Sequence, residues 1–255
     1  MILLFRQLAL IVFALSSSGL ALAQETESLP VPEAEEEVDW LEHYYKSPSP
    51  DRVVAQIKDY AAEGVLEQEG AKPALIAFLA QIIRQNRADL ATWYNDLQGL
   101  SPEQLQVFHT AMLFSRTDEA DQIMRERFGK QYDEQKQITP KILELPLDQR
   151  MTTDMLWGFY YATGSKNAVR RIVTCFRFVN APDNPEGVDV PEGYVPIYKQ
   201  LPAFAFDSLI ANGERHPLVV EHLQTLLAED ETLIAPEREG IEAILEELGV
   251  ESGTP

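Results

Sequence analysis

Cysteine and basic residues are scarce in this sequence. It contains one cysteine, and 41 acidic residues stand against 21 Lys and Arg, which gives a net charge of −20 over 255 residues. A surface this acidic repels nucleic acid phosphates and anionic lipid headgroups. We therefore expect no nucleic acid partner and no membrane association of the processed chain, and favour basic or cationic partners.

The lone Cys175 has no partner for an internal disulfide, so the fold must be stable without one. It lies beside an apolar helical stripe, and no histidine pattern accompanies it. This setting favours a buried, inert thiol over a catalytic nucleophile.

The usual catalytic motifs are also missing. There is no G-x-S-x-G elbow, phosphate-binding glycine loop or dinucleotide fingerprint. His216 and His222 are six residues apart, whereas zinc-binding helices place two histidines four apart. The remaining histidines are His43 and His109. The sequence thus predicts no catalytic residues, no metal ligands and no cofactor.

The N-terminal segment is typical of a secretory signal peptide. Arg6 precedes an apolar run that ends in Ala21-Leu22-Ala23, a small-x-small cleavage pattern. We expect residues 1–23 to be removed after Ala23, which places the protein in the periplasm or outside the cell; an uncleaved membrane anchor is the alternative. Residues 24–39 hold seven acids and no base, and we expect a disordered linker there.

No stretch alternates apolar and polar residues for long enough to predict a strand. From residue 40 to 255 the apolar residues recur at helical spacing, as in Leu75, Phe78, Leu79 and Ile82. We predict a single all-α domain of nine to eleven helices in antiparallel helix-turn-helix pairs. Pairs of roughly 30–40 residues indicate an α-solenoid-like (TPR-like) array, although no repeat consensus is present.

Local signals place several boundaries. Ser101-Pro102-Glu103-Gln104 is the best helix start, because serine can cap, proline fits the first turn and Gln104 can close a capping box. Asn212-Gly213 is expected to end a helix. The polar stretch 130–146 predicts a less regular hinge with a helical turn near Ile142, and residues 181–196 predict a long loop.

The central feature of the sequence is a helical hairpin over residues 152–180, onto which we expect the other helices to pack. Its first helix is apolar all round, which indicates burial. Gly164 and Ser165 supply the turn and the next cap. The second helix carries a stripe that we expect to be buried: Val169, Ile172, Val173, Phe176 and Val179.

The hairpin is positively charged, in contrast to the acidic chain as a whole. No acid occurs between Met155 and Pro182, whereas four cations do. Aromatic and arginine side chains often dominate interfaces, so the hairpin offers a candidate binding surface. The alternative is that the aromatics fill the core and the cations meet acids elsewhere in the chain. The candidate residues are Trp157, Tyr160, Tyr161, Lys166, Arg170, Arg171 and Arg177.

Three stretches carry a resemblance: WLEHYYKSPSPDRVVAQI at 40–57, DMLWGFYYATGSKNAVRRIV at 154–173 and NGERHPLVVEHL at 212–223. Together they resemble a loosely defined group of uncharacterised bacterial exported all-helical proteins. The shared residues are mainly packing and turn residues. The resemblance implies one all-α domain and no activity.

These observations favour a non-catalytic protein-interaction or scaffold module of the cell envelope, with a protein partner there. Two alternatives stay open. One is an envelope enzyme of hydrolase type, whose site would join His109, His216 or His222 to a carboxylate. The other is a small-molecule binder that uses the space near Trp157 and the loop 181–196.

Overall fold

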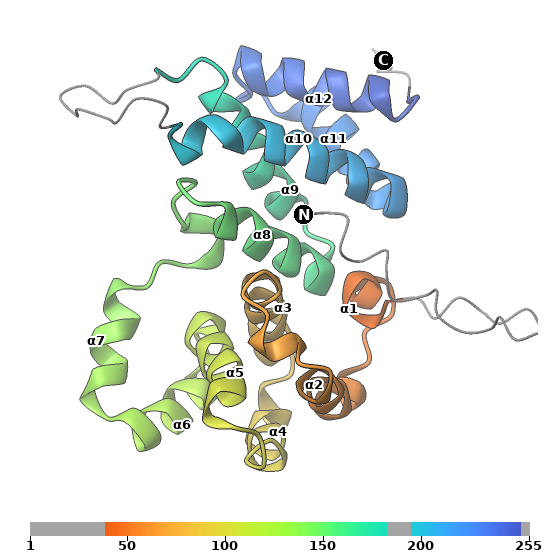
Figure 1. Cartoon of the computed structure of the whole chain (residues 1–255). Coiled ribbons are helices and arrows are strands. Elements are labelled where there is room, and N and C mark those ends of the chain that lie inside the picture. Colours follow the sequence, from red (N-terminus) through yellow and green to blue (C-terminus); the bar gives the residue numbers. More distant parts are fainter. Residues whose placement is uncertain (1–38, 183–194, 251–255) are drawn as a thin grey trace, which may run out of the picture. The chain divides into compact units, whose positions relative to one another are not determined.

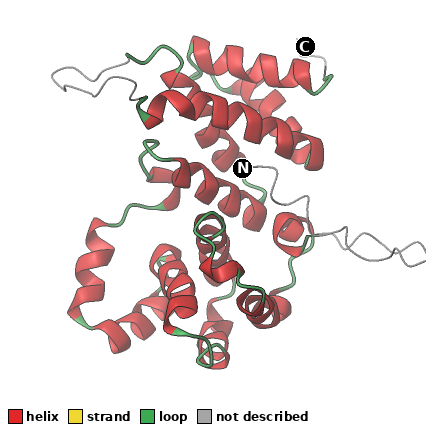
Figure 2. Ribbon diagram, viewed as in Figure 1, coloured by secondary structure: helices red, strands yellow, loops and turns green. Residues whose placement is uncertain are grey.

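The structure, a computed structural model, describes residues 39–182 and 195–250. These residues form twelve α-helices and six short 3₁₀ helices and contain no strand, so the all-α prediction is confirmed and the helix count exceeds the predicted nine to eleven (Figures 1 and 2). The expected signal peptide, nearly all of the acidic linker and most of the loop 181–196 lie outside the described residues. None of the described helices combines the length and apolarity needed to cross a bilayer.

The α-helices, in chain order, are α1 (Trp40–His43), α2 (Val53–Ala62), α3 (Lys72–Gln85), α4 (Leu90–Asp96), α5 (Pro102–Ser115), α6 (Asp118–Phe128), α7 (Lys130–Ile138), α8 (Arg150–Thr163), α9 (Lys166–Val173), α10 (Ile197–Arg215), α11 (Pro217–Glu229) and α12 (Ala235–Glu247). The 3₁₀ helices are η2 (Tyr44–Lys46), η3 (Pro50–Arg52), η4 (Val65–Glu67), η5 (Arg87–Asp89), η6 (Ile142–Glu144) and η7 (Thr174–Phe178).

Helix α3 forms the most extensive contacts, with α5 on one side and α8 on another. Nine of its 14 residues are buried, as its apolar sequence predicts. The other helices therefore do not pack on the hairpin alone, contrary to the sequence prediction. Its first helix, α8, packs on α3, and α3 also contacts α5. The α3–α8 approach is close because α8 has Gly158 at the contact, where an added Cβ would lie 1.9 Å from the Ala74 carbonyl oxygen.

The hairpin itself follows the predicted local chemistry. Gly164 ends α8 with a φ of 63°, and the Ser165 side chain accepts a hydrogen bond from the Asn167 amide at the start of α9. The stripe prediction is wrong at Val179, which is 54% exposed. The α-helix ends at Val173 and continues as the 3₁₀ helix η7. A turn of three residues rotates the following side chains off the buried face.

Two further boundaries differ from the sequence prediction. Residues 130–138 form helix α7, although the 3₁₀ turn near Ile142 is as predicted. Lys, Gln and Glu favour a helix without forming an apolar stripe, so periodicity alone misses such a segment. Helix α10 continues through Asn212 and Gly213 to Arg215. Gly213 lies against Leu248 and Asn212 is buried, so both residues serve packing.

Candidate binding pocket

The three aromatic residues of the predicted surface lie in the core. Trp157, Tyr160 and Tyr161 are at most 8% exposed. The Trp157 and Tyr161 rings stack at 6.1 Å, and the Tyr161 hydroxyl donates to the Asn212 side chain at 2.7 Å. These residues join α8 to α10.

The four cations of the hairpin meet acids from the α11–α12 region or a backbone oxygen. Arg170 reaches Asp230 at 2.5 Å and Glu237 at 3.1 Å. Arg177 reaches the same buried Glu237 at 2.6 Å. Lys166 lies 3.9 Å from Glu229, and Arg171 donates to the Leu145 carbonyl at 2.7 Å. Contacts within the chain thus account for the local charge reversal.

Three of the four histidines lie near Tyr160, and His109 lies apart from them. The His43 and His216 rings are 4.8 Å apart, and the rings of His216 and His222 lie 5.9 and 6.4 Å from Tyr160. His216 is fully buried, with Nδ1 3.4 Å from the Tyr45 hydroxyl and Nε2 3.9 Å from the Glu42 carboxylate. Burial, with His43 and Arg215 next, lowers the pKa of His216 to about 3. His222 bonds the Gly164 carbonyl at 2.8 Å. Within the described residues His216 is the one histidine that lies near a carboxylate, and it is fully buried; these residues include no cluster able to hold a metal.

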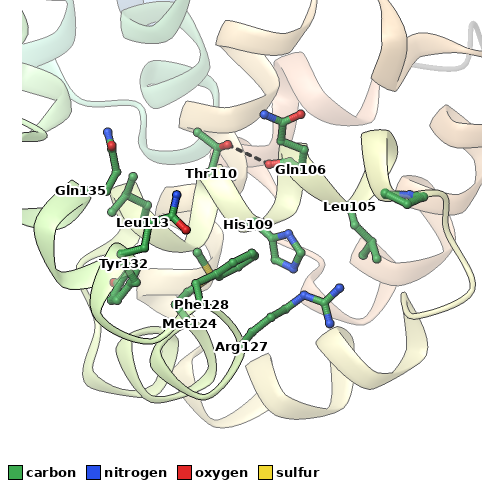
Figure 3. A pocket seen from close by; sticks show the side chains of 12 residues that line it. Leu105, Gln106, His109, Thr110, Leu113, Met124, Arg127, Phe128, Tyr132 and Gln135 are labelled. Atoms are coloured by element: carbon green, nitrogen blue, oxygen red, sulfur yellow. Dashed lines mark hydrogen bonds between the residues drawn. The ribbon is translucent and has the colours of Figure 1, made fainter.

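A pocket of about 500 Å³ opens between α5, α6 and α7 (Figure 3). Its lining mixes apolar and polar side chains. Pro102, Leu105, Gln106, His109, Thr110 and Leu113 come from α5, Met124, Arg127 and Phe128 from α6, and Gln131, Tyr132 and Gln135 from α7.

Well-capped helix ends position the pocket walls. The capping box of Ser101 and Gln104 starts α5, as its sequence predicts. Arg116, in the left-handed region with a φ of 54°, ends α5 and lets the chain turn to Thr117, which caps α6. Gly129, with a φ of 58°, turns the chain from α6 into α7. Three successive helices therefore fold around one space.

Helix α7 is held against α6 by a polar network centred on Asp121. This carboxylate is 5% exposed, accepts from the Tyr132 hydroxyl at 2.6 Å and pairs with Lys136. Burial alone would raise the pKa of Asp121, but the hydrogen bonds from Lys136 and Tyr132 outweigh it and lower the pKa. Arg125 adds a 2.8 Å bond to Asp133. The pocket wall is thus fixed by bonds made within the chain.

The electrostatics of the pocket centre on His109 and Arg127. Burial first, and the Arg127 charge second, lower the pKa of His109 to about 4, so its ring is neutral at pH 7. The ring bonds the Tyr94 hydroxyl through Nε2 at 3.2 Å and meets the Phe128 ring edge-on at 5.1 Å. Arg127 lies over Phe128 at 5.8 Å and makes no ion pair within the described part of the chain. The lining contains no carboxylate.

Sequence reasoning did not find this pocket, although a signal for it exists. Gln106, His109, Thr110 and Leu113 recur at spacings of three and four, so they share one face of α5. A face that mixes polar and apolar side chains fits neither a core stripe nor a solvated surface. The opposite wall could not be inferred, because residues 130–138 were not predicted to be helical.

Comparison of the chain with protein-family models, with curated proteins and with solved structures finds no match.

Proposed function

We propose that this protein is a non-catalytic binding protein of the cell envelope and that its ligand occupies the α5–α6–α7 pocket. The pocket itself carries the proposal. Ligand sites are usually concave spaces that combine apolar side chains with polar groups, and this pocket of about 500 Å³ combines both kinds. Its walls are fixed by capped helices and by the Asp121 network, so binding needs little ordering of the protein.

The side chains of the pocket suit binding better than chemistry. Its titratable groups are His109, Arg127 and Tyr132. The pKa of His109 is about 4, and burial together with Asp121 raises the pKa of Tyr132. His109 and Tyr132 therefore exchange no proton near pH 7, and the lining has no thiol, serine or carboxylate to act as a nucleophile or base.

Two further parts of the proposal rest on the sequence. The cell-envelope location rests on the signal peptide pattern at residues 1–23, and the non-catalytic role agrees with the resemblance to exported helical proteins. We also retain the interpretation of the domain as stacked helix pairs in a solenoid-like array. Contacts between successive helices such as α5 and α6 support it, whereas the extensive contact between α3 and α8 does not.

Either a protein segment or a small molecule could occupy the pocket. The sequence favours an envelope protein partner, whose side chains would enter the space between α5 and α7. The volume of the pocket favours a small molecule, because about 500 Å³ lies within the range of sites that enclose drug-sized ligands.

A pocket-blocking variant tests the proposal. Gln106 is exposed and lines the pocket, so Gln106→Trp fills the space from a solvent-facing position on α5. Gln137→Trp is the matched control, since Gln137 is exposed on α7 and does not line the pocket. Each protein is crosslinked in the cell and, separately, purified for native mass spectrometry.

The proposal predicts that the wild type and Gln137→Trp retain the same crosslinked partner or co-purified ligand mass, and that Gln106→Trp loses it. A crosslinked protein would show that the ligand is a protein segment, and a small added mass would show that it is a small molecule. Equal retention by both variants would place binding elsewhere and contradict the proposal.

A further inference from the structure

We propose that the pocket binds a small amphipathic carboxylate, with the acid at Arg127 and His109 and the apolar body against Leu113, Met124 and Phe128. This inference rests on the proposed function and specifies the chemistry of its ligand. The net charge of −20 favours cationic partners, whereas the ligand proposed for the pocket is an anion.

The proposed binding of an anion rests on Arg127, a cation without an ion pair among the described residues. Arg127 makes no ion pair within the described residues, although the chain carries 41 acids. Its charge acts on His109, so the guanidinium lies within electrostatic reach of the ring that faces the pocket (Figure 3). A guanidinium binds a carboxylate through two parallel hydrogen bonds. The neutral His109 ring, with the proton on Nδ1 when Nε2 accepts from Tyr94, supplies a further donor.

The acids around the pocket do not compete for Arg127. Asp121 and Asp133 are bonded to Lys136 and Arg125. Glu126 accepts from Gln122 at 3.1 Å. More distant charges are screened, because the Debye length is about 8 Å at physiological ionic strength. Arg127 is the one charged side chain in the lining besides the titratable His109 and Tyr132, and no carboxylate lines the pocket.

The apolar body of the proposed ligand is inferred from the apolar side chains of the pocket lining. Leu113 and Met124 are buried side chains that line the pocket, and Phe128 is 38% exposed there. Met adapts to irregular ligand shapes, and Phe offers a ring face or edge for stacking. Around them Gln106, Gln131 and Gln135 are exposed amides at the pocket lining. A compact acid with one apolar end fits this separation of charged, polar and apolar side chains.

Three probes of equal shape test the inference: 4-phenylbutyrate, the neutral 4-phenylbutyramide and the cationic 4-phenylbutylamine. Each is titrated into the purified wild type, Arg127→Gln and Arg84→Gln, followed by calorimetry and by NMR. Arg84 is exposed on α3 and does not line the pocket, so its variant makes the same change in net charge elsewhere.

We expect the wild type and Arg84→Gln to bind the acid up to about 5-fold more tightly than the amide, the range for a pair with an exposed arginine. Arg127→Gln should bind acid and amide alike. Equal or tighter binding of the amide or the amine by the wild type would overturn the carboxylate inference while leaving the proposed binding function standing. If no probe binds and the Gln106→Trp variant loses no ligand, the proposed function fails as well.

Discussion

Replacing Gly158 by alanine should destabilise the fold by pushing α3 and α8 apart. The added Cβ would lie 1.9 Å from the backbone oxygen of Ala74, whereas ordinary contacts begin at 3.4 Å. The difference of 1.5 Å must come from movement of a helix, because a backbone carbonyl inside a helix cannot rotate away. α3 carries most of its side chains in the core, so that movement disturbs many contacts.

The magnitude follows from two opposing effects. Overpacking of a core costs about 1–3 kcal/mol and occasionally more. Because the atom that is met is backbone, we place Gly158→Ala near the upper end, at about 3 kcal/mol. Alanine regains about 1 kcal/mol through its higher helix propensity. We therefore expect a net loss of about 2 kcal/mol in the free energy of unfolding.

Urea unfolding followed by circular dichroism measures this loss, with Gly213→Ala as the matched control. Gly213 is also a buried helical glycine, but the nearest atom to its added Cβ is a terminal methyl of Leu248 at 2.6 Å. That side chain can change its rotamer, so the helix propensity gain offsets much of the cost. Equal stabilities of Gly158→Ala and Gly213→Ala would refute the reasoning.

Three further predictions concern the pocket and the buried histidines. Asp121→Asn should lower the free energy of unfolding by about 1–3 kcal/mol and weaken binding of 4-phenylbutyrate, because α7 loses its charged bond to Lys136; unchanged affinity in a titration would contradict the role of this network. 4-phenylbutyrate should raise the pKa of His109 above about 4, since a nearby carboxylate favours the charged ring, and an NMR titration with an unmoved pKa would place the acid elsewhere. The pKa of His216 is lowered to about 3 from an ordinary value of 6.5, so its contribution to stability is complete above pH 6.5 and is lost as pH falls toward 3. Urea unfolding between pH 7 and pH 5 should show that decline, and it should be smaller in His216→Gln.

The sequence could predict what depends on neighbouring residues. The capping box at Ser101, the hairpin turn at Gly164 and the apolar helix that contains Pro73 all follow from local chemistry. The change from α to 3₁₀ geometry before Val179 could not be predicted, because apolar periodicity says nothing about the number of residues per turn.

The candidate site depended on tertiary packing, which a single sequence does not specify. The hairpin cations have no acid near them along the chain, yet Glu237 reaches Arg170 from 67 residues away and Arg177 from 60 residues away. Arg127 has several acids close to it along the chain, yet two of them, Asp121 and Asp133, form ion pairs with Lys136 and Arg125 instead. Charge along a sequence and charge around a side chain are different quantities.

The most direct test of the binding pocket is to record intermolecular nuclear Overhauser effects between the phenyl protons of 4-phenylbutyrate and methyl-labelled protein. Binding in the pocket predicts contacts to the methyl groups of Leu113 and Met124, and their loss in Gln106→Trp. Contacts that avoid both methyl groups and persist in Gln106→Trp would contradict the account.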